Sequence, residues 1–287
     1  MRNLSVIILT LLVTYVAIAK TSSNDSSITS FSNHKQAEQI TQLPVTQHRI
    51  VVIAHRGSHI NVPENTLAAY ETAIKEGADY VEIDLRTTKD GHLVIMHDES
   101  IFKMTGNNGD VKDLNYNEIR NLKIIPVNKN DTANYRVPDF KSVLHLCKGK
   151  INIYLDFKDA DVSKTHKLIK EAGMEKNIVV YLNTKEQYPQ WKKTAPGIPL
   201  MSSLPENMND PTLNNFLNEV YLSVVDNATT PDKLNLVHKR KIAVWLDVQS
   251  KDEGPEKWEQ ALNTGVDGLQ SDYPGALIKF LNDKGIR

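Results

Sequence analysis

The sequence alternates short runs of β-branched residues with helical stretches from residue 50 to near its C-terminus. Eight of the runs have the length and composition of buried strands. They cover residues 50–55, 79–85, 151–157, 178–182, 199–203, 219–225, 241–247 and 266–270. Parallel strands need crossover connections, so strands that alternate with helices indicate a parallel sheet. Eight such units in 287 residues predict an α/β fold, a closed (β/α)8 barrel, with an open doubly wound sheet as the alternative.

The stretches between the strands contain helix-start signals. Asn65 is predicted to cap a helix that ends before Gly77. Four later helices are expected to begin with Pro near the first position, at Asp210-Pro211, Thr230-Pro231, Gly254-Pro255 and Tyr273-Pro274.

One segment interrupts the alternation. Residues 92–97 also have the pattern of a strand, but only residues 86–91 separate them from the strand at 79–85. A parallel crossover needs about a dozen residues, whereas Lys89-Asp90-Gly91 is a tight hairpin signal. We therefore expect an extended β-hairpin after the second strand, followed by a small insertion at residues 98–138 over the barrel mouth.

The N-terminus has the pattern of an export signal. One basic residue, Arg2, precedes an apolar run that ends in Ala17-Ile18-Ala19, an A-x-A cleavage pattern. The prediction is a signal peptide at residues 1–19, a flexible leader at 20–46 and the barrel domain at 47–287. An uncleaved membrane anchor is the alternative. Cleavage would leave a periplasmic or secreted protein with no stable membrane anchor.

The charge balance limits the classes of partner. The chain has 34 Lys and Arg against 35 Asp and Glu, a net charge of −1. Affinity for nucleic acids or anionic membranes depends largely on excess positive charge, so neither is an expected partner. The single cysteine, Cys147, permits no internal disulfide and is expected to be buried and inert. The oligomeric state stays open.

Two strands bring acidic side chains toward the barrel mouth. Alternate side chains of a strand share a face, so Glu82 and Asp84 point the same way. Asp156 and Lys158 likewise share the inward face at the end of their strand. Buried carboxylates that repel one another destabilise a fold unless a cation compensates them. Oxygen-only ligation by Glu82, Asp84 and Asp156 selects one hard divalent cation, Mg²⁺ or Ca²⁺, over zinc.

Two simpler interpretations of these residues stay open. Glu82 and Asp84 would be a solvated pair if their strand lay at the edge of an open sheet. Asp156 and Lys158 would only neutralise each other if no further carboxylate approached them. Either arrangement would leave no metal site.

Histidines lie at two strand ends beside the acidic residues. His55 ends the first strand and precedes Arg56, and His97 ends the returning hairpin strand. Cleavage of a phosphodiester requires charge neutralisation at phosphorus, deprotonation of a nucleophile and protonation of an alkoxide. The cation, Arg56 and Lys158 suit the first task, and the two imidazoles suit the others. The combination predicts a metal-dependent phosphodiesterase.

Ordered motifs support this interpretation. They are His55-Arg56-Gly57, Pro63-Glu64-Asn65-Thr66, Glu82-Ile83-Asp84-Leu85, His97-Asp98, and Asp267-Gly268 with Ser271-Asp272-Tyr273-Pro274. In this order and spacing they resemble the signature of the glycerophosphodiester phosphodiesterase family, over about residues 50 to 280. The resemblance implies a TIM barrel of the PLC-like phosphodiesterase superfamily and a divalent metal. It also implies hydrolysis of a small-molecule glycerophosphodiester to glycerol 3-phosphate and an alcohol.

The resemblance further implies roles for individual residues. It makes His55 and His97 the acid/base pair, Arg56 a phosphate ligand, and Glu82 and Asp84 metal ligands. Glu64 would lie close to the substrate or the metal, with favourable charge at a helix N-terminus as the alternative.

Two positions depart from the family pattern. The strand-end motif reads Asp156-Phe157-Lys158, where the family usually has Glu first, and Asp there resembles the related sphingomyelinase D group. The tryptophan segment at residues 244–248 lacks the polar residue often seen three positions after Trp245. Trp245 is expected either to line the substrate pocket or to lie in the core.

Two other functions stay open as alternatives. An enzyme similar to sphingomyelinase D or phospholipase D would cleave intact lipids and would need an apolar rim, of which the polar insertion shows little sign. A catalytically idle phosphodiester-binding protein would have no need of His55 and His97. The sequence also leaves open the released alcohol, the native metal, and whether water or the substrate's own glycerol hydroxyl attacks first.

Overall fold

The computed structural model describes residues 40–206 and 210–287. The predicted signal peptide at 1–19 and most of the predicted leader at 20–46 lie outside the described residues. Among the helices that are described, none is both long and apolar enough to cross a membrane.

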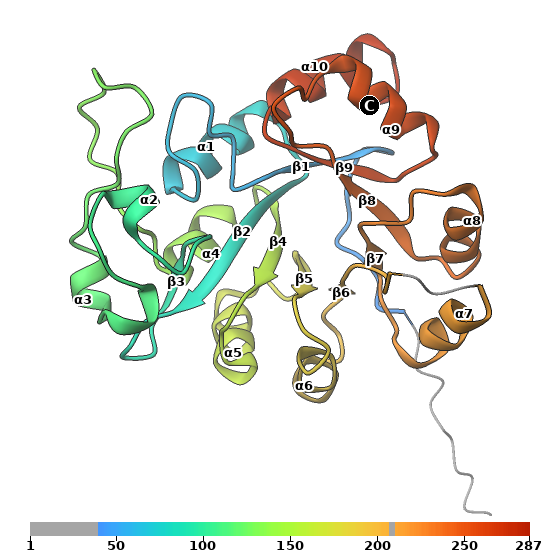
Figure 1. Cartoon of the computed structure of the whole chain (residues 1–287), viewed down its shortest axis with the longest axis horizontal. Coiled ribbons are helices and arrows are strands. Elements are labelled where there is room, and N and C mark those ends of the chain that lie inside the picture. The colour runs from blue at the N-terminus through green and yellow to red at the C-terminus, as the bar shows by residue number, and fades with distance from the viewer. Residues whose placement is uncertain (1–39, 207–209) are drawn as a thin grey trace, which may run out of the picture. The chain divides into compact units, whose positions relative to one another are not determined.

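Eight parallel strands close into a barrel, and a ninth strand pairs with the second of them (Figure 1). The barrel strands are β1 (Val51–Ala54), β2 (Tyr80–Thr87), β4 (Asn152–Phe157), β5 (Ile178–Leu182), β6 (Leu200–Met201), β7 (Val224–Val225), β8 (Ala243–Asp247) and β9 (Gly268–Ser271). Each strand pairs with the next in this order, and β9 pairs with β1 to close the ring. The predicted (β/α)8 barrel is confirmed, and the open sheet is excluded.

Two of the strands, β6 and β7, are much shorter than predicted. β6 and β7 have two residues each, whereas the sequence predicted strands at 199–203 and 219–225. Glu219 is instead the last residue of a helix, and Leu222 is fully buried before β7 begins. The apolar run that suggested a longer strand therefore includes residues that are buried before β7 begins but do not pair in the sheet.

Helices surround the barrel on its outer face (Figure 1). They are α1 (Leu67–Glu76), α4 (Phe140–Cys147), α5 (Val162–Ala172), α6 (Gln187–Thr194), α7 (Asp210–Glu219), α8 (Pro231–Lys239), α9 (Pro255–Asn263) and α10 (Pro274–Asp283). The four helices predicted from their Pro residues begin as expected. The main apolar core packs these helices against the strands and includes Cys147, which is a buried free thiol.

The start of α1 differs from the prediction. Thr66, not Asn65, is the N-cap, and its hydroxyl accepts a hydrogen bond from the backbone N–H of Ala69. Asn65 has left-handed backbone geometry, with φ 54°. Its side-chain amide donates to Asp84 Oδ2 at 2.7 Å, and its carbonyl oxygen accepts from the Tyr70 hydroxyl at 2.8 Å. Asn65 therefore positions a predicted metal ligand instead of capping the helix.

The hairpin after the second strand is confirmed. β2 extends past the barrel and pairs with the antiparallel strand β3 (Leu93–Ile95). The insertion that follows contains α2 (Phe102–Thr105), the 3-10 helix η1 (Val111–Asp113) and α3 (Tyr116–Ile119). A separate apolar cluster supports the insertion, which therefore has a small core of its own.

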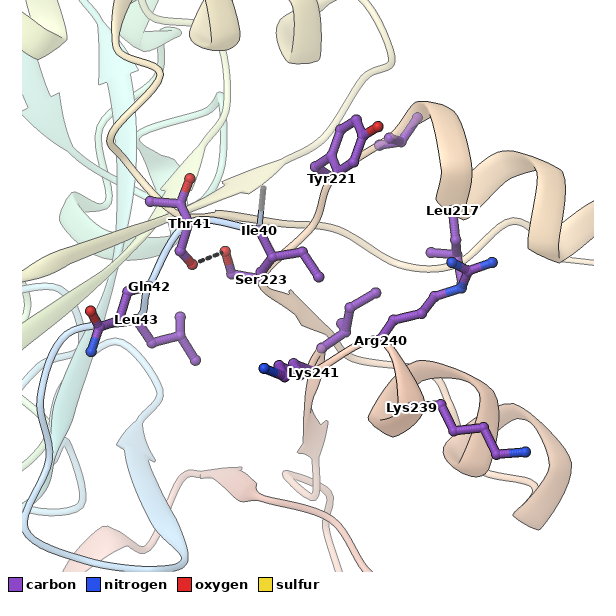
Figure 2. A pocket seen from close by; sticks show the side chains of 12 residues that line it. Ile40, Thr41, Gln42, Leu43, Leu217, Tyr221, Ser223, Lys239, Arg240 and Lys241 are labelled. Carbon is purple, nitrogen blue, oxygen red and sulfur yellow. Dashed lines mark hydrogen bonds between the residues drawn. The ribbon is translucent and has the colours of Figure 1, made fainter. Parts of the chain in front are cut away.

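Residues 40–46 lie against the N-terminal ends of the barrel strands, although the sequence assigned them to the leader. The Ser223 hydroxyl, just before β7, donates to the carbonyl oxygen of Thr41 at 2.7 Å (Figure 2). Ile40 and Leu43 pack against the apolar clusters of the barrel, and with Lys241 they help to line a cavity of about 920 Å³. Contact with the barrel therefore begins by residue 40, not at residue 47.

Trp245 lies inside the barrel below the C-terminal ends of the strands. It is 2% exposed and belongs to the apolar cluster that fills the barrel interior. Its ring centroid lies 4.9 Å from that of Tyr80 and 6.5 Å from that of Tyr154. On the other side, a Cβ added at Gly268 would lie 2.7 Å from Trp245 Cδ1. Only glycine fits against this indole without displacing it.

We expect Gly268→Ala to lower the free energy of unfolding by about 1–3 kcal/mol, because the added methyl overpacks the barrel interior. Urea unfolding of the purified protein measures the change. Gly197→Ala is the control, since a Cβ at Gly197 meets no atom within 4 Å. Equal stability of the two variants would contradict the close packing between β8 and β9.

Candidate active site

The C-terminal ends of the barrel strands enclose a polar cavity of about 420 Å³. Its lining comes from strand ends around the barrel: His55, Arg56, Glu82, Asp84, His97, Tyr154, Asp156, Tyr181, Asn183, Asp226, Asp247, Gln249 and Gln270. Barrels of this type have their active sites at this end. The larger cavity beside residues 40–43 lies at the opposite end and contains none of the predicted site residues.

Three carboxylates meet on one side of the cavity. Glu82 and Asp84 lie on β2, and Asp156 lies opposite Asp84 on β4 in the strand register. One oxygen from each carboxylate lies within 4.8 Å of the other two. Glu82 is 3% exposed and Asp84 is 1% exposed, so they are not a solvated edge pair. An all-oxygen donor set of this size fits a hard divalent cation such as Mg²⁺ or Ca²⁺.

Burial and mutual repulsion control the ionisation of this cluster. Loss of hydration raises the pKa of Glu82 well above its usual value, and the charges of Asp84 and Asp156 raise it further. Burial also acts to raise the pKa of Asp84, but the positive charges of Lys158 and Arg56 outweigh it, so that this pKa is lowered. A cation between the three carboxylates would favour the ionised form of each.

Two basic side chains lie at the edge of the carboxylate cluster. Lys158 Nζ is 3.1 Å from Asp84 Oδ1 and also contacts Asp156, so Lys158 and Asp156 are not an isolated ion pair. Arg56 Nε is 3.5 Å from Asp84 Oδ2, and the Arg56 backbone N–H donates to Glu82 Oε2 at 2.8 Å. Both cations are therefore close enough to the cluster to contact an anion bound beside it.

A left-handed turn sets the direction of Arg56. Arg56 has φ 52°, and the next residue, Gly57, has φ 82°. A Cβ at Gly57 would lie 2.7 Å from the backbone carbon of Ala69, so glycine permits the close approach of this turn to α1. The histidine-arginine-glycine motif thus has a steric requirement as well as a chemical one.

Glu64 lies behind Arg56 and does not line the cavity among the described residues. Its Oε1 is 2.9 Å from Arg56 Nη1 and 2.9 Å from Lys103 Nζ. Burial acts to raise the Glu64 pKa, but these two cations outweigh it and lower that pKa. The structure therefore places Glu64 as a support for Arg56, next to the cavity but outside its lining, where the sequence left open a place close to the substrate or the metal.

Each of the two predicted catalytic histidines has a carboxylate at Nδ1. His55 Nδ1 is 2.7 Å from Asp272 Oδ1, and His97 Nδ1 is 2.7 Å from Asp98 Oδ1. Burial acts to raise the Asp272 pKa, but the hydrogen bond from His55 and the charges of His55, His59 and Arg56 together outweigh it and lower that pKa. A carboxylate that accepts the Nδ1 proton leaves Nε2 to exchange protons with a ligand.

Arg86, from the extended end of β2, holds the backbone of His97 in place. Its Nε and Nη2 donate to the His97 carbonyl oxygen at 2.9 and 2.7 Å. Asp159 Oδ2 in turn accepts from Arg86 Nη1 at 2.8 Å. The hairpin is therefore what brings this imidazole to the barrel mouth.

The structure does not place Trp245 in the cavity. The sequence left open whether it lines the pocket or lies in the core, and its side chain belongs to the core. Trp245 and Asp247 share a face of β8, and only the second of these reaches the cavity, because it is the last residue of the strand.

Four acidic residues of the site had no role predicted from the sequence. Asp98 and Asp272 were visible inside the motifs, and their contacts with the histidines are only visible in three dimensions. Asp226 follows β7 and Asp247 is the last residue of β8. Their position at the ends of predicted strands was the feature of the sequence that could have identified them as site residues. Burial raises the pKa of Asp247 to about 7, with contributions from the charges of Asp226 and Asp156.

The chain is similar to known proteins of one family. Residues 55–204 match the Glycerophosphoryl diester phosphodiesterase family. A glycerophosphodiester phosphodiesterase of Caldanaerobacter subterraneus subsp. tengcongensis is 31% identical over 254 residues, which cover 83% of this chain and all of the relative. A crystal structure of an Agrobacterium tumefaciens glycerophosphodiester phosphodiesterase has a TM-score of 0.70 at 24% identity, over 80% of this chain and 99% of that one. An Oleispira antarctica phosphodiesterase, solved with the product sn-glycerol 3-phosphate, has a TM-score of 0.67 at 19% identity, over 81% and 96% of the two chains.

The two structural matches bear on the fold alone, and they agree with the barrel described above. The family match covers more than half of the chain, and the Caldanaerobacter relative aligns along its whole length. The chain therefore belongs to the glycerophosphoryl diester phosphodiesterase family, a family of enzymes.

Proposed function

We propose that this enzyme hydrolyses glycerophosphodiesters to glycerol 3-phosphate and an alcohol, with a divalent cation and histidine acid/base catalysis. The observation that supports this most is the placement of two histidines, each paired with a carboxylate through Nδ1, in the same cavity as the three-carboxylate cluster. The product bound to the Oleispira relative is the product that the proposed reaction would release.

The basic residues would bind the phosphate group. A phosphodiester has one negative charge, and attack at phosphorus spreads further charge over its oxygens. The Arg56 guanidinium offers paired N–H donors and Lys158 offers a point charge at the edge of the cluster. Glu64 and Lys103 restrict the guanidinium, so less side-chain freedom is lost when phosphate binds.

The two imidazoles would move the protons. One accepts the proton of the attacking hydroxyl through Nε2 as the new P–O bond forms. The other gives a proton to the alkoxide oxygen as the old P–O bond breaks, and the alcohol leaves neutral. Asp98 and Asp272 fix the tautomer of each ring and stabilise its protonated form.

Glu82, Asp84 and Asp156 would bind the cation, and their oxygen-only chemistry fits Mg²⁺ or Ca²⁺. When bound, the cation supplies Lewis-acid polarisation of a phosphate oxygen and fixes the position of the substrate. Asn65 restrains Asp84, and Asn183 donates to Asp156 Oδ1 at 2.6 Å, so the ligand oxygens are oriented by neighbouring amides.

The purified enzyme is expected to release glycerol 3-phosphate from glycerophosphocholine in the presence of Mg²⁺ or Ca²⁺. Excess chelator should stop the reaction, and a stoichiometric excess of the cation should restore it. An enzyme-coupled assay of glycerol 3-phosphate measures both effects. Intact phosphatidylcholine and sphingomyelin, tested in parallel, should be poor substrates. Activity that survives the chelator would show that the reaction needs no metal. Preferential cleavage of intact lipid would show that the substrates are lipids and not glycerophosphodiesters.

A further inference from the structure

The cavity has a second half that the proposed reaction does not use. Most of its lining residues lie at the ends of β5, β7, β8 and β9, which do not pair with β2, and Tyr154 comes from β4, where it lies next to Glu82 in the strand register. We call this the far half; it is formed by Tyr154, Tyr181, Asp226, Asp247, Gln249 and Gln270. The described residues that line the far half include no Lys, Arg or His. The carboxylates of Asp226 and Asp247 therefore have no cationic neighbour among the far-half residues.

Asp247 is available to a ligand. Its side chain has accessible surface inside the cavity, even though the barrel wall encloses it and limits its hydration. Burial, with the charges of Asp226 and Asp156, raises its pKa to about 7, which shows how poorly the local environment compensates the carboxylate charge. Gln270 Nε2, at 3.0 Å from Asp247 Oδ1, is a neutral donor and leaves that charge in place.

Three buried acceptor atoms in the far half have no hydrogen-bond donor among the described residues. Gln270 is only 5% exposed, and its Oε1 has no partner among the described residues. Gln249 Oε1 and Asp226 Oδ1 also have no hydrogen-bond donor within the described part of the chain. A buried acceptor without a donor costs free energy, which a ligand that supplies positive charge or N–H groups would recover.

The far half does not have the donor set of a second metal site. A metal site of this kind needs at least three His, Cys, Asp or Glu side chains with ligand atoms close together. Within the described part of the chain, one such group has its ligand atoms within 4.8 Å of one another, and it consists of Glu82, Asp84 and Asp156. Two tyrosines, Tyr154 and Tyr181, instead line the far half together with the two carboxylates, and their ring centroids lie 5.8 Å apart. Carboxylates together with aromatic faces bind alkylammonium groups, through charge and cation–π attraction.

We propose that the far half binds the positively charged ammonium group of the leaving alcohol, and so selects glycerophosphodiesters of choline or ethanolamine. This inference rests on the proposed function, because it needs the phosphate to lie beside the carboxylate cluster and His97. The substrate then spans the barrel mouth, with the alcohol directed toward β7 and β8. Asp247 and Asp226 act as specificity residues.

Substrate competition tests the inference. Glycerophosphocholine and the uncharged-alcohol substrate glycerophosphoglycerol share everything except the released alcohol. The parent enzyme is expected to prefer the choline substrate by about tenfold or more in kcat/KM, as charge recognition of about 1.4 kcal/mol would give. Asp247→Asn is expected to reduce that ratio about tenfold. The ratio isolates the subsite, because any disturbance of the metal or the histidines affects both substrates alike.

Two variants serve as controls. Asp226→Asn is expected to change the ratio in the same direction, and it replaces Asp247→Asn if the latter does not fold. Asp283→Asn removes a surface carboxylate on α10 that pairs with Lys279, and it should keep the parent ratio. An equal loss for both substrates in Asp247→Asn would mean that the carboxylate binds shared glycerol hydroxyls, which overturns the inference. An unchanged ratio in both cavity variants overturns it as well.

A binding measurement separates this inference from the proposed function. Calorimetry should detect choline binding to the parent enzyme, and its neutral isostere 3,3-dimethylbutanol should bind at least about tenfold more weakly. If no glycerophosphodiester is hydrolysed but choline still binds with this preference, the proposed function fails and the cation subsite stands. If hydrolysis occurs and the two compounds bind alike, the subsite fails alone.

Discussion

His97→Ala is expected to lower kcat by about 10²–10⁴-fold, the usual contribution of one acid or base group in the transition state. The side chain is 37% exposed, so its removal leaves no buried cavity and should change the unfolding midpoint little. The loss therefore belongs to the chemistry. Steady-state hydrolysis of glycerophosphocholine measures it, with circular dichroism to verify the fold.

The hairpin that presents His97 offers a matched control. His92 lies at the other end of β3, is 54% exposed and stacks on Tyr116 with ring centroids 4.8 Å apart. His92→Ala should keep the parent kcat. Asp98→Asn should show an intermediate loss and an altered pH profile of kcat, because the Nδ1 partner is neutralised while the imidazole stays. A His97→Ala enzyme as active as the parent would exclude this residue from catalysis.

Asp84→Asn is expected to weaken divalent-cation binding by more than about 100-fold and to lower kcat/KM by at least about 10³-fold. The substitution conserves shape but removes the charge that Lys158, at 3.1 Å, and Arg56, at 3.5 Å, both face. A ligand that binds only the folded state raises the unfolding temperature. Addition of Ca²⁺ or Mg²⁺ should therefore raise the unfolding temperature of the parent and leave that of the variant unchanged.

Glu64→Gln separates cation binding from phosphate binding. Glu64 contacts Arg56 and Lys103 but is not part of the carboxylate cluster. This variant should keep the cation-dependent increase in unfolding temperature while its KM rises, because the guanidinium is less restrained. A cation response in Asp84→Asn equal to that of the parent would show that the metal binds elsewhere.

The sequence was sufficient for the barrel and for most of the site because both depend on regular spacing. Alternation along β2 alone puts Glu82 and Asp84 on one face, and the strand register then brings Asp156 beside them. The short connection after β2 forces a hairpin, which moves His97 to the same end of the barrel. These inferences need only strand geometry and the length of a crossover.

Other features depend on depth and on long-range contacts, which spacing does not encode. The alternation of side chains along β8 predicts that Trp245 points into the barrel, but it does not predict how deep the side chain lies. The structure places Trp245 in the apolar interior below the cavity. The contact of Asp272 with His55 joins residues 217 positions apart. Asn is a residue type that often caps helices, which is why the sequence predicted this role for Asn65. In the structure Asn65 has a left-handed backbone and donates a hydrogen bond to Asp84, so it does not cap the helix.

The attachment of residues 40–43 beside the start of β7 has a practical consequence. An affinity tag, linker or surface support joined upstream of residue 40 would leave the barrel at the face remote from the substrate entrance. Immobilised enzyme made in this way should keep its mouth open to the surrounding solution, whereas attachment through the hairpin would place the matrix beside the reacting phosphate.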